Sequence, residues 1–288
     1  MTTVVLGDSG ITLGATDAHG VEWRLQDESD LWQPKPSPRD VSGDRTIGHG
    51  LWSATEYYGG RTQTLRVNVH APSHEALHAA KDRLFAALSL RAFRVVGYEP
   101  NHPAGRWSLM RVDGQVPWTE LTSGTDRGGA IASTSIALRA DDPLIYSEAI
   151  EQAYTGAPSS VGGLSWPTSW PTSWDATVTT GLLRLTNYGS EPTPVLWRID
   201  GPVSDPVVTH TASGERFRLG LDIAAGEWVT VDAATRRVLA QGDPQATRRP
   251  QWSGDWLYLA PGTSEYAFTG EGTDERTTIT ATVRSAWI

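Results

Sequence analysis

Apolar and polar residues alternate with a period of two over many short segments of this chain, and Gly, Pro, Asn and Ser separate the segments. Successive side chains of a β-strand point to opposite faces, so this alternation is typical of half-buried strands. In the first half it predicts strands at residues 4–6, 11–13, 21–25, 51–58, 62–70, 93–98, 107–116 and 131–139. In the second half the alternating pairs are Leu183 and Leu185, Trp197 and Ile199, Phe217 and Leu219, and Trp228 and Thr230.

Two reversals and one extended segment connect these strands. Gly59-Gly60 predicts a tight hairpin between the strands on either side of it. Asp232, followed by Ala-Ala-Thr-Arg, predicts a second hairpin that leads into residues 238–239. The segment 33–44 carries three alternating prolines, which favour extended backbone, so it is predicted to be an arm outside the core.

One segment, residues 73–90, has the period of a helix. Leu77, Ala80 and Leu84 fall on one helical face, Ser73 is suited to cap the N-terminus, and a proline precedes it. The alternation elsewhere therefore predicts a mainly β protein that contains a single α-helix.

Composition narrows the possible functions of the 288 residues. The sequence has no cysteine, which excludes disulfides and thiolate metal sites, and its net charge of −9 argues against broad binding to nucleic acid. No apolar run approaches the length of a membrane span, and the first residues do not resemble a signal peptide. Thirteen tryptophans without a complete catalytic motif favour assembly or binding.

Proline and tryptophan alternate in the segment 156–180, where Ser-Trp-Pro-Thr occurs twice in succession. Proline excludes a regular helix or a central strand, so Trp166, Trp170 and Trp174 are expected on an extended arm. Two interpretations stay open. The arm is either a stiff linker whose indoles lie on the neighbouring domain, or a segment that docks on a neighbouring subunit.

Two short motifs suggest catalysis but lack the necessary context. Gly7-Asp8-Ser9-Gly10 contains a possible nucleophile, but no base can be assigned to Ser9, and a turn between two strands is the simpler interpretation. His74-Glu75-Ala76-Leu77-His78 matches the H-E-x-x-H zinc pattern, but a third ligand is missing. The sequence therefore predicts no catalytic, cofactor or metal site.

A set of acidic residues and the many tryptophans leave two further options. The acidic residues lack the spacing of a calcium loop, so solvated charge is the expected role of Asp27, Glu28, Asp30, Asp40 and Asp44. Exposed tryptophans in the second half would suit stacking on sugars, as in a carbohydrate-binding adhesin. The sequence alone does not separate exposed from buried tryptophans.

The order of several motifs resembles the distal tail proteins of long-tailed bacteriophages, in particular minor tail proteins of phages that infect actinobacteria. In the first half these motifs are Gly48-His49-Gly50, Gly59-Gly60-Arg61, Ala71-Pro72-Ser73 before the helix, and Asp141-Asp142-Pro143. The Trp-Pro arm follows. In the second half they are Asn187-Tyr188-Gly189, Pro192 and Pro194, Ile199-Asp200-Gly201-Pro202, the strand 228–232, and Leu259-Ala260-Pro261-Gly262.

The resemblance implies a β-barrel or sandwich-like domain with one helix at residues 1–150, a linker arm at 151–180, and a galectin-like β-sandwich at 181–288. It implies a non-enzymatic structural protein of the virion tail tip, made in the host cytoplasm. Such proteins form a homo-hexameric ring that joins the tail tube protein to the tail-tip hub, with the tape measure protein as a further possible partner. No membrane or specific nucleic-acid partner is expected, although DNA can pass through the ring.

Overall fold

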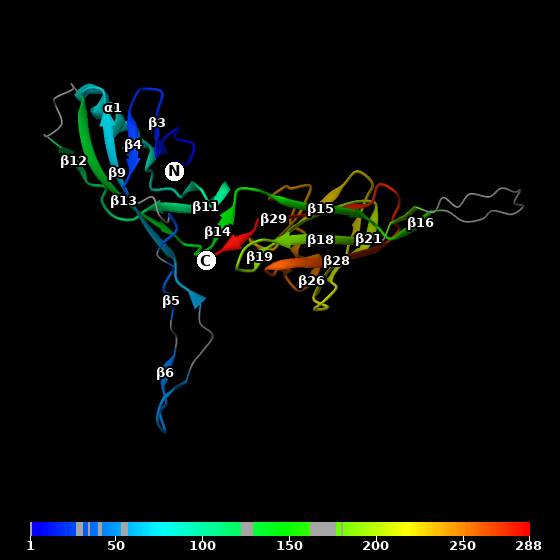
Figure 1. Ribbon diagram of the computed structural model, residues 1–288. Coiled ribbons are helices and arrows are strands. Elements are labelled where there is room, and N and C mark those ends of the chain that lie inside the picture. The colour runs from blue at the N-terminus through cyan, green and yellow to red at the C-terminus, as the bar shows by residue number, and fades with distance from the viewer. Residues whose placement is uncertain are drawn as a thin grey trace, which may run out of the picture. The chain divides into compact units, whose positions relative to one another are not determined.

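The computed structural model of the protein describes residues 2–26, 31–33, 35–39, 42–52, 57–121, 129–161, 177–179 and 181–288 (Figure 1). They form two compact units. One contains Met1–Ala149 and Trp287–Ile288, and the other contains Ile150–Ala286.

The first unit is built on a sheet whose strand order is β2-β1-β10-β11-β13-β9-β4-β3, with β12 beside β13 and β14 beside β11. All of its pairings are antiparallel. The strands are β1 Thr3–Leu6, β2 Thr12–Leu13, β3 Ala15–Thr16, β4 Glu22–Leu25, β9 Arg61–Ala71, β10 Phe93–Glu99, β11 His102–Val112, β12 Trp118–Leu121, β13 Ala130–Ala140 and β14 Ile145–Ser147.

The longest ladder in this sheet joins β9 to β13, in register from Ala130 opposite Ala71 to Ala140 opposite Arg61. Alternate residues of both strands are buried. Helix α1 (His74–Ala87) contributes its own buried stripe to the same core, formed by Leu77, Ala80 and Leu84. The backbone N–H of Ala76 donates to the Ser73 side chain at 3.1 Å, which confirms the predicted N-cap.

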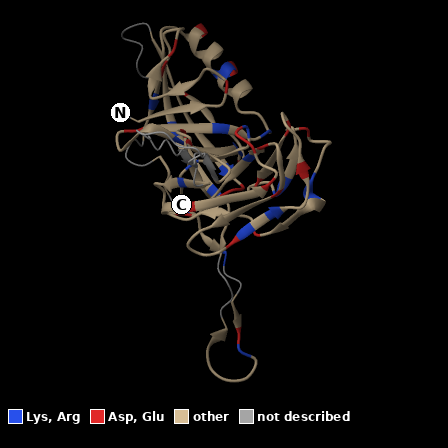
Figure 2. Cartoon of the chain, turned by 90° about the vertical axis from the view of Figure 1, so that its right-hand side faces the viewer, with Lys and Arg blue, Asp and Glu red and all other residues tan. Residues whose placement is uncertain are grey.

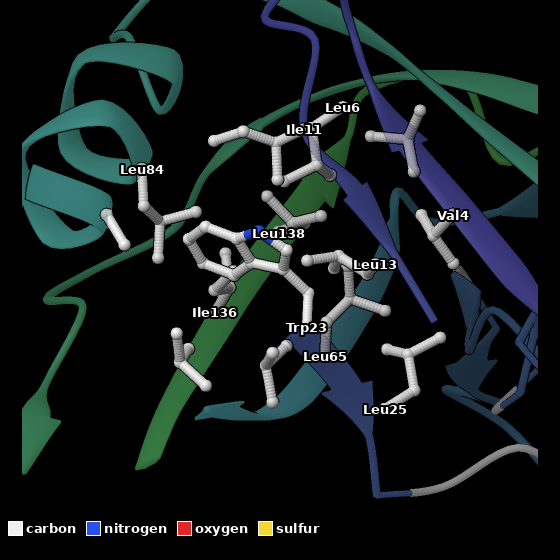
Figure 3. Packing of buried hydrophobic residues seen from close by; sticks show 14 of the residues in the cluster. Val4, Leu6, Ile11, Leu13, Trp23, Leu25, Leu65, Leu84, Ile136 and Leu138 are labelled. Carbon is white, nitrogen blue, oxygen red and sulfur yellow. The ribbon is translucent and has the colours of Figure 1, made fainter. Parts of the chain in front are cut away.

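Trp23 of β4 lies at the centre of this core, and Figure 3 shows its indole among Leu84 of α1 and Leu138 of β13. Its Nε1–H donates to an Asp17 carboxylate oxygen at 3.1 Å, and the Arg83 guanidinium of α1 pairs with the same oxygen at 2.9 Å. Burial alone raises the pKa of the Asp17 carboxyl, but hydrogen bonds from the Trp23 indole and two backbone N–H groups outweigh it. Together with the Arg83 charge they bring this pKa below its ordinary value of 3.8.

The hairpin predicted at Gly59-Gly60 is wrong. Strand β7 (Leu51–Trp52) pairs with β6 (Gly43–Asp44), and β8 (Tyr57–Tyr58) pairs with β5 (Pro38–Arg39), so the proline-rich segment contributes two strands to a separate hairpin. The two glycines instead carry the chain from β8 into β9. A Cβ on Gly60 would lie 2.7 Å from the Ala140 carbonyl oxygen, so glycine is needed there for close backbone approach and not for a turn.

The second unit contains two antiparallel sheets, ordered β15-β29-β20-β24-β25 and β18-β28-β21-β22-β26, with β23 beside β21. Two further pairs are β16 with β17 and β19 with β27. The strands are β15 Glu151–Gly156, β16 Ser159–Val161, β17 Thr177–Thr179, β18 Leu182–Asn187, β19 Thr193–Pro194, β20 Leu196–Asp200, β21 Val203–His210, β22 Arg216–Leu219, β23 Asp222–Ile223, β24 Trp228–Asp232, β25 Arg237–Ala240, β26 Trp252–Gly254, β27 Tyr258–Leu259, β28 Gly262–Glu271 and β29 Thr278–Val283. The last strand of the chain, β30 (Ala286–Trp287), pairs instead with β14 in the sheet of the first unit.

The buried faces of the two sheets share one core, as in a β-sandwich. Trp197 of β20 packs edge-on against Phe217 and Tyr266 of the opposite sheet, with ring centroids 6.0 and 5.1 Å away. Burial raises the pKa of Tyr266 to about 12. The predicted hairpin at Asp232 is confirmed, because β24 pairs with β25 and the Asp232 carboxylate accepts the N–H of Ala234 at 2.9 Å.

These findings confirm the mainly β fold class. Among the described residues α1 is the only α-helix, and the second unit also contains a short 3₁₀ helix, η2 (Arg249–Gln251). The structure differs from the expected division of the chain at two places. Glu151–Gly156, assigned to the linker arm on sequence, forms β15 and pairs with β29 over its full length. The last two residues belong to the first unit.

Replacing Asp17 by Asn removes the charge that faces Arg83, and it also removes one of the two oxygens that accept the Trp23 indole and the backbone N–H groups of His19 and Val21. We expect a loss of about 2 kcal/mol of unfolding free energy at pH 7. Because the pKa of Asp17 is lower in the folded than in the unfolded chain, its ionised form stabilises the fold above pH 3.8, and that contribution disappears as pH falls through the folded pKa. Denaturant unfolding of both proteins between pH 7 and pH 3 should therefore show a difference that shrinks towards acid. The exposed Asp8→Asn variant is the control. An undiminished difference at pH 3 would assign the effect to packing.

Candidate interaction surfaces

The Gly7–Gly10 motif forms a turn between β1 and β2. The Ser9 hydroxyl donates to the Leu6 carbonyl at 2.5 Å and accepts the Ile11 N–H at 3.2 Å, while Gly7 and Gly10 have φ angles of +53° and +73°. The Ser9 hydroxyl is thus hydrogen-bonded to backbone groups of the turn. The structure brings no base to it among the described contacts.

The two histidines of the H-E-x-x-H match lie at the start of α1, and both are exposed. The His78 ring lies 3.8 Å from the Glu120 carboxylate of β12. Within the described ranges, no group of three or more His, Asp or Glu side chains could hold a metal ion. Asp44 lies in β6, whereas Asp27, Glu28, Asp30 and Asp40 lie outside the described residues.

The base of the separate hairpin is fixed by Arg61, the first residue of β9, which is fully buried. Its Nε–H donates to the Pro143 carbonyl at 3.0 Å, and its Nη1 donates to the Trp32 carbonyl at 2.6 Å. Two sequence motifs, Gly59-Gly60-Arg61 and Asp141-Asp142-Pro143, therefore meet at one place. A charged residue at this position gave no sign of burial in the sequence.

Beyond this base, β5, β6, β7 and β8 form a separate hairpin (Figure 1). Large apolar side chains of this hairpin are exposed. The exposed fractions are 92% for Ile47, 57% for Leu51, 53% for Trp52, 61% for Tyr57 and 38% for Tyr58. Two-stranded ribbons are marginally stable alone, and clustered exposed apolar groups mark interaction sites. We call Ile47, Leu51, Trp52, Tyr57 and Tyr58 the hairpin surface.

The structure shows which tryptophans are buried and which lie at the surface, a distinction that the sequence alone did not give. Trp23, Trp32 and Trp197 belong to the two cores. Trp252 and Trp256 stack on each other at 4.3 Å and are partly buried. Trp228 lies on the outer face of its sheet, beneath Arg198. The expected interface residues Trp166, Trp170 and Trp174 lie outside the described residues, so their role stays a prediction.

Charged residues are interspersed over the strands of both units (Figure 2). Several of them form cross-strand ion pairs. The best buried is Arg106 with Glu99 at 2.5 Å, where the two side chains are 13% and 10% exposed. None of the helices within the described residues is long and apolar enough to cross a membrane.

One junction in the second unit depends on Asn187, at the end of β18. Its amide N–H groups donate to the carbonyls of Glu191 and Leu259 at 2.8 and 3.1 Å, and its Oδ1 accepts the Gly189 N–H at 2.8 Å. The side chain is 2% exposed. A Cβ on Gly189 would overlap the Ala286 carbonyl, so a larger residue does not fit there. The glycine of the Asn-x-Gly motif therefore allows the backbone at Ala286 to pack closely against this turn.

Residues 188–287, which include most of this junction, match the family model of the siphovirus-type tail component, C-terminal domain. The resemblance to phage distal tail proteins is confirmed. A structural role in the virion tail, as the sequence predicts, is confirmed by the same match. The matched family is one of siphovirus tail components, and the match covers residues 188–287 of the chain.

Solved structures of the same kind resemble the chain over its length. The SPP1 Dit protein, described as a paradigm of the hub adsorption apparatus in phages infecting Gram-positive bacteria, has a TM-score of 0.62 at 12% identity, covering 100% of both chains. Chains of the phage P2 baseplate in its activated conformation have TM-scores of 0.44 with Ca and 0.45 with Sr. They are 11% and 10% identical to this chain and cover 95% of it, and the match spans 100% and 99% of those chains. A sequence comparison with curated proteins finds no match.

The Asn187 junction predicts which glycine substitutions the second unit tolerates. Gly189→Ala should lower the unfolding free energy of the second unit by about 3 kcal/mol, because its methyl group must displace backbone. Gly220→Ala is the matched control, since its Cβ would lie 3.7 Å from the nearest atom, the Gln251 carbonyl oxygen. Thermal unfolding of the two variants measures the difference. Equal melting temperatures would contradict the assigned role of Gly189.

Proposed function

We propose that this chain is a structural component of the phage tail tip, six copies of which form a ring between the tail tube protein and the tail-tip hub. The family match over residues 188–287 carries the proposal. The fold likeness to SPP1 Dit over the full length of both chains supports it, because the first unit is included in that likeness. No catalytic activity is assigned.

The first unit, within residues 1–150, is the part we assign to the ring. Its hairpin surface supplies apolar contact area that the same chain leaves exposed. A head-to-tail ring repeats one contact between every pair of neighbours, so a protruding segment on each copy can be covered by the next copy. We assign the hairpin surface to this contact, and the second unit to the outside of the ring.

The Trp-Pro arm is the second proposed contact. Prolines alternate with Trp166, Trp170 and Trp174 in the sequence, a pattern that favours extended backbone, and indoles give large contact areas at interfaces. The tail tube protein, the tail-tip hub and the tape measure protein are the proposed neighbours of the ring. The net charge of −9 is compatible with DNA passing through it, because like charges repel.

The ring predicts an assembly of six times the 31.2 kDa chain mass. Light scattering after size exclusion, together with negative-stain images, should show six-fold particles with the purified chain alone or with the tail tube protein added. A chain that stays monomeric under both conditions would contradict the proposal.

The contribution of the hairpin surface is tested by the double variant Leu51→Ser, Trp52→Ser. It should shift the assembly towards monomer because it removes exposed apolar area from the contact. The control is Leu90→Ser, Leu109→Ser, which removes two leucines of the same unit that are 93% and 52% exposed. If both double variants assemble like the wild type, the contact lies elsewhere, and a triple Trp→Ser change at 166, 170 and 174 tests the arm.

A further inference from the structure

The sheet β15-β29-β20-β24-β25 has an outer face with an unusual composition. Its register places Tyr154 opposite Thr280, Thr280 opposite Arg198, and Arg198 opposite Thr230. In the next row Thr278 lies opposite Asp200, and Asp200 lies opposite Trp228. The face thus combines Arg198 and Asp200 of the central strand β20 with threonine hydroxyls of β29 and β24, and it carries one aromatic ring on β15 and one on β24.

Arg198 is held rigidly on this face. Its guanidinium lies 4.5 Å from the centroid of the Trp228 ring. Its Nε and Nη2 both donate to the Asp200 carboxylate, at 3.1 and 2.7 Å. Within the described residues no partner is found for its Nη1, so a fixed donor remains available at the surface. The Arg198–Asp200 pair is therefore preorganised and needs little ordering when a ligand binds.

A groove of about 670 Å³ runs over this face, lined in part by Gln152, Tyr154, Arg198, Trp228 and Thr280. Tyr154 is 80% exposed although it lies in a strand. Three strand spacings separate it from Trp228, which is about 14 Å. The groove is balanced in charge, because Arg198 and Arg276 are matched by Asp200 and Glu227.

We propose that this groove binds a neutral oligosaccharide. A pyranose ring has an apolar C–H face that stacks on an aromatic ring, and a rim of hydroxyl groups that bond to planar donors and acceptors. Tyr154 supplies the exposed ring, while Arg198, Asp200 and Gln152 supply fixed polar groups. The balanced charge disfavours a polyanion, and the three strand spacings between Tyr154 and Trp228 give room for several linked sugars. This proposal does not rest on the ring, because every residue in it belongs to the second unit.

The test is binding of the full-length protein to an array of neutral hexose and N-acetylhexosamine oligosaccharides, followed by titration calorimetry with the neutral tetrasaccharides that are retained. Tyr154→Ala and Arg198→Lys should each weaken binding about ten-fold, the first by removing the stacking face and the second by removing the planar fork. Tyr188→Ala is the matched control, since Tyr188 is 72% exposed on a turn outside the groove. It should bind as the wild type does.

Three outcomes would overturn the proposal. One is an array on which no neutral oligosaccharide is retained. Another is retention that Tyr154→Ala and Tyr188→Ala reduce equally, which places the site elsewhere. The third is loss of assembly in Tyr154→Ala without any loss of saccharide binding, which makes this face a protein contact. Because the ring is measured by mass and imaging, failure of saccharide binding leaves that measurement unaffected.

Discussion

The ladder between β9 and β13 is the constraint on which the first unit depends. Along both strands every second residue is buried, so a slip of one residue would turn the apolar set to solvent and the polar set to the core. The register places Leu65 and Ile136 opposite each other beneath Trp23, and α1 closes the same core with Leu84 (Figure 3). The Asp17 carboxylate then ties the helix to β4 through Arg83 and Trp23. Helix position and strand register therefore support each other.

In the second unit the alternating residues likewise require each of the two sheets to bury its apolar face. This requirement determines which surfaces of the unit can bind partners. Each sheet buries one face against the other, which leaves the outer faces and the strand edges as the surfaces that can hold partners. On the outer face that carries Trp228, Arg198 lies over the Trp228 ring and fixes its position. A protein of this construction is suited to binding, because its accessible groups are fixed by the sheets beneath them.

The sequence predicted those parts of the fold that depend on local periodicity. The helix followed from Ser73 and the spacing of Leu77 and Leu84, and the hairpin at Asp232 followed from its turn residues. The pairing of β5 with β8 could not be predicted, because two-residue strands between prolines carry no period. The burial of Arg61 and the exposure of Tyr154 could not be predicted from the sequence either, because both depend on the folded arrangement. Arg61 donates to the carbonyls of two residues distant in the chain. Tyr154 lies on β15, at the edge of its sheet.

Three residues of the motifs that carried the family resemblance, Gly60, Arg61 and Gly189, are explained by backbone packing. Gly60 allows close approach to the Ala140 carbonyl, Gly189 allows the same at Ala286, and Arg61 satisfies carbonyls of two separate segments. Each is a position where two stretches of chain meet and where few side chains fit. The other requirement of the fold is alternation, which many sequences satisfy. A fold with these two requirements tolerates extensive change elsewhere, which accounts for a whole-chain likeness to SPP1 Dit at only 12% identity.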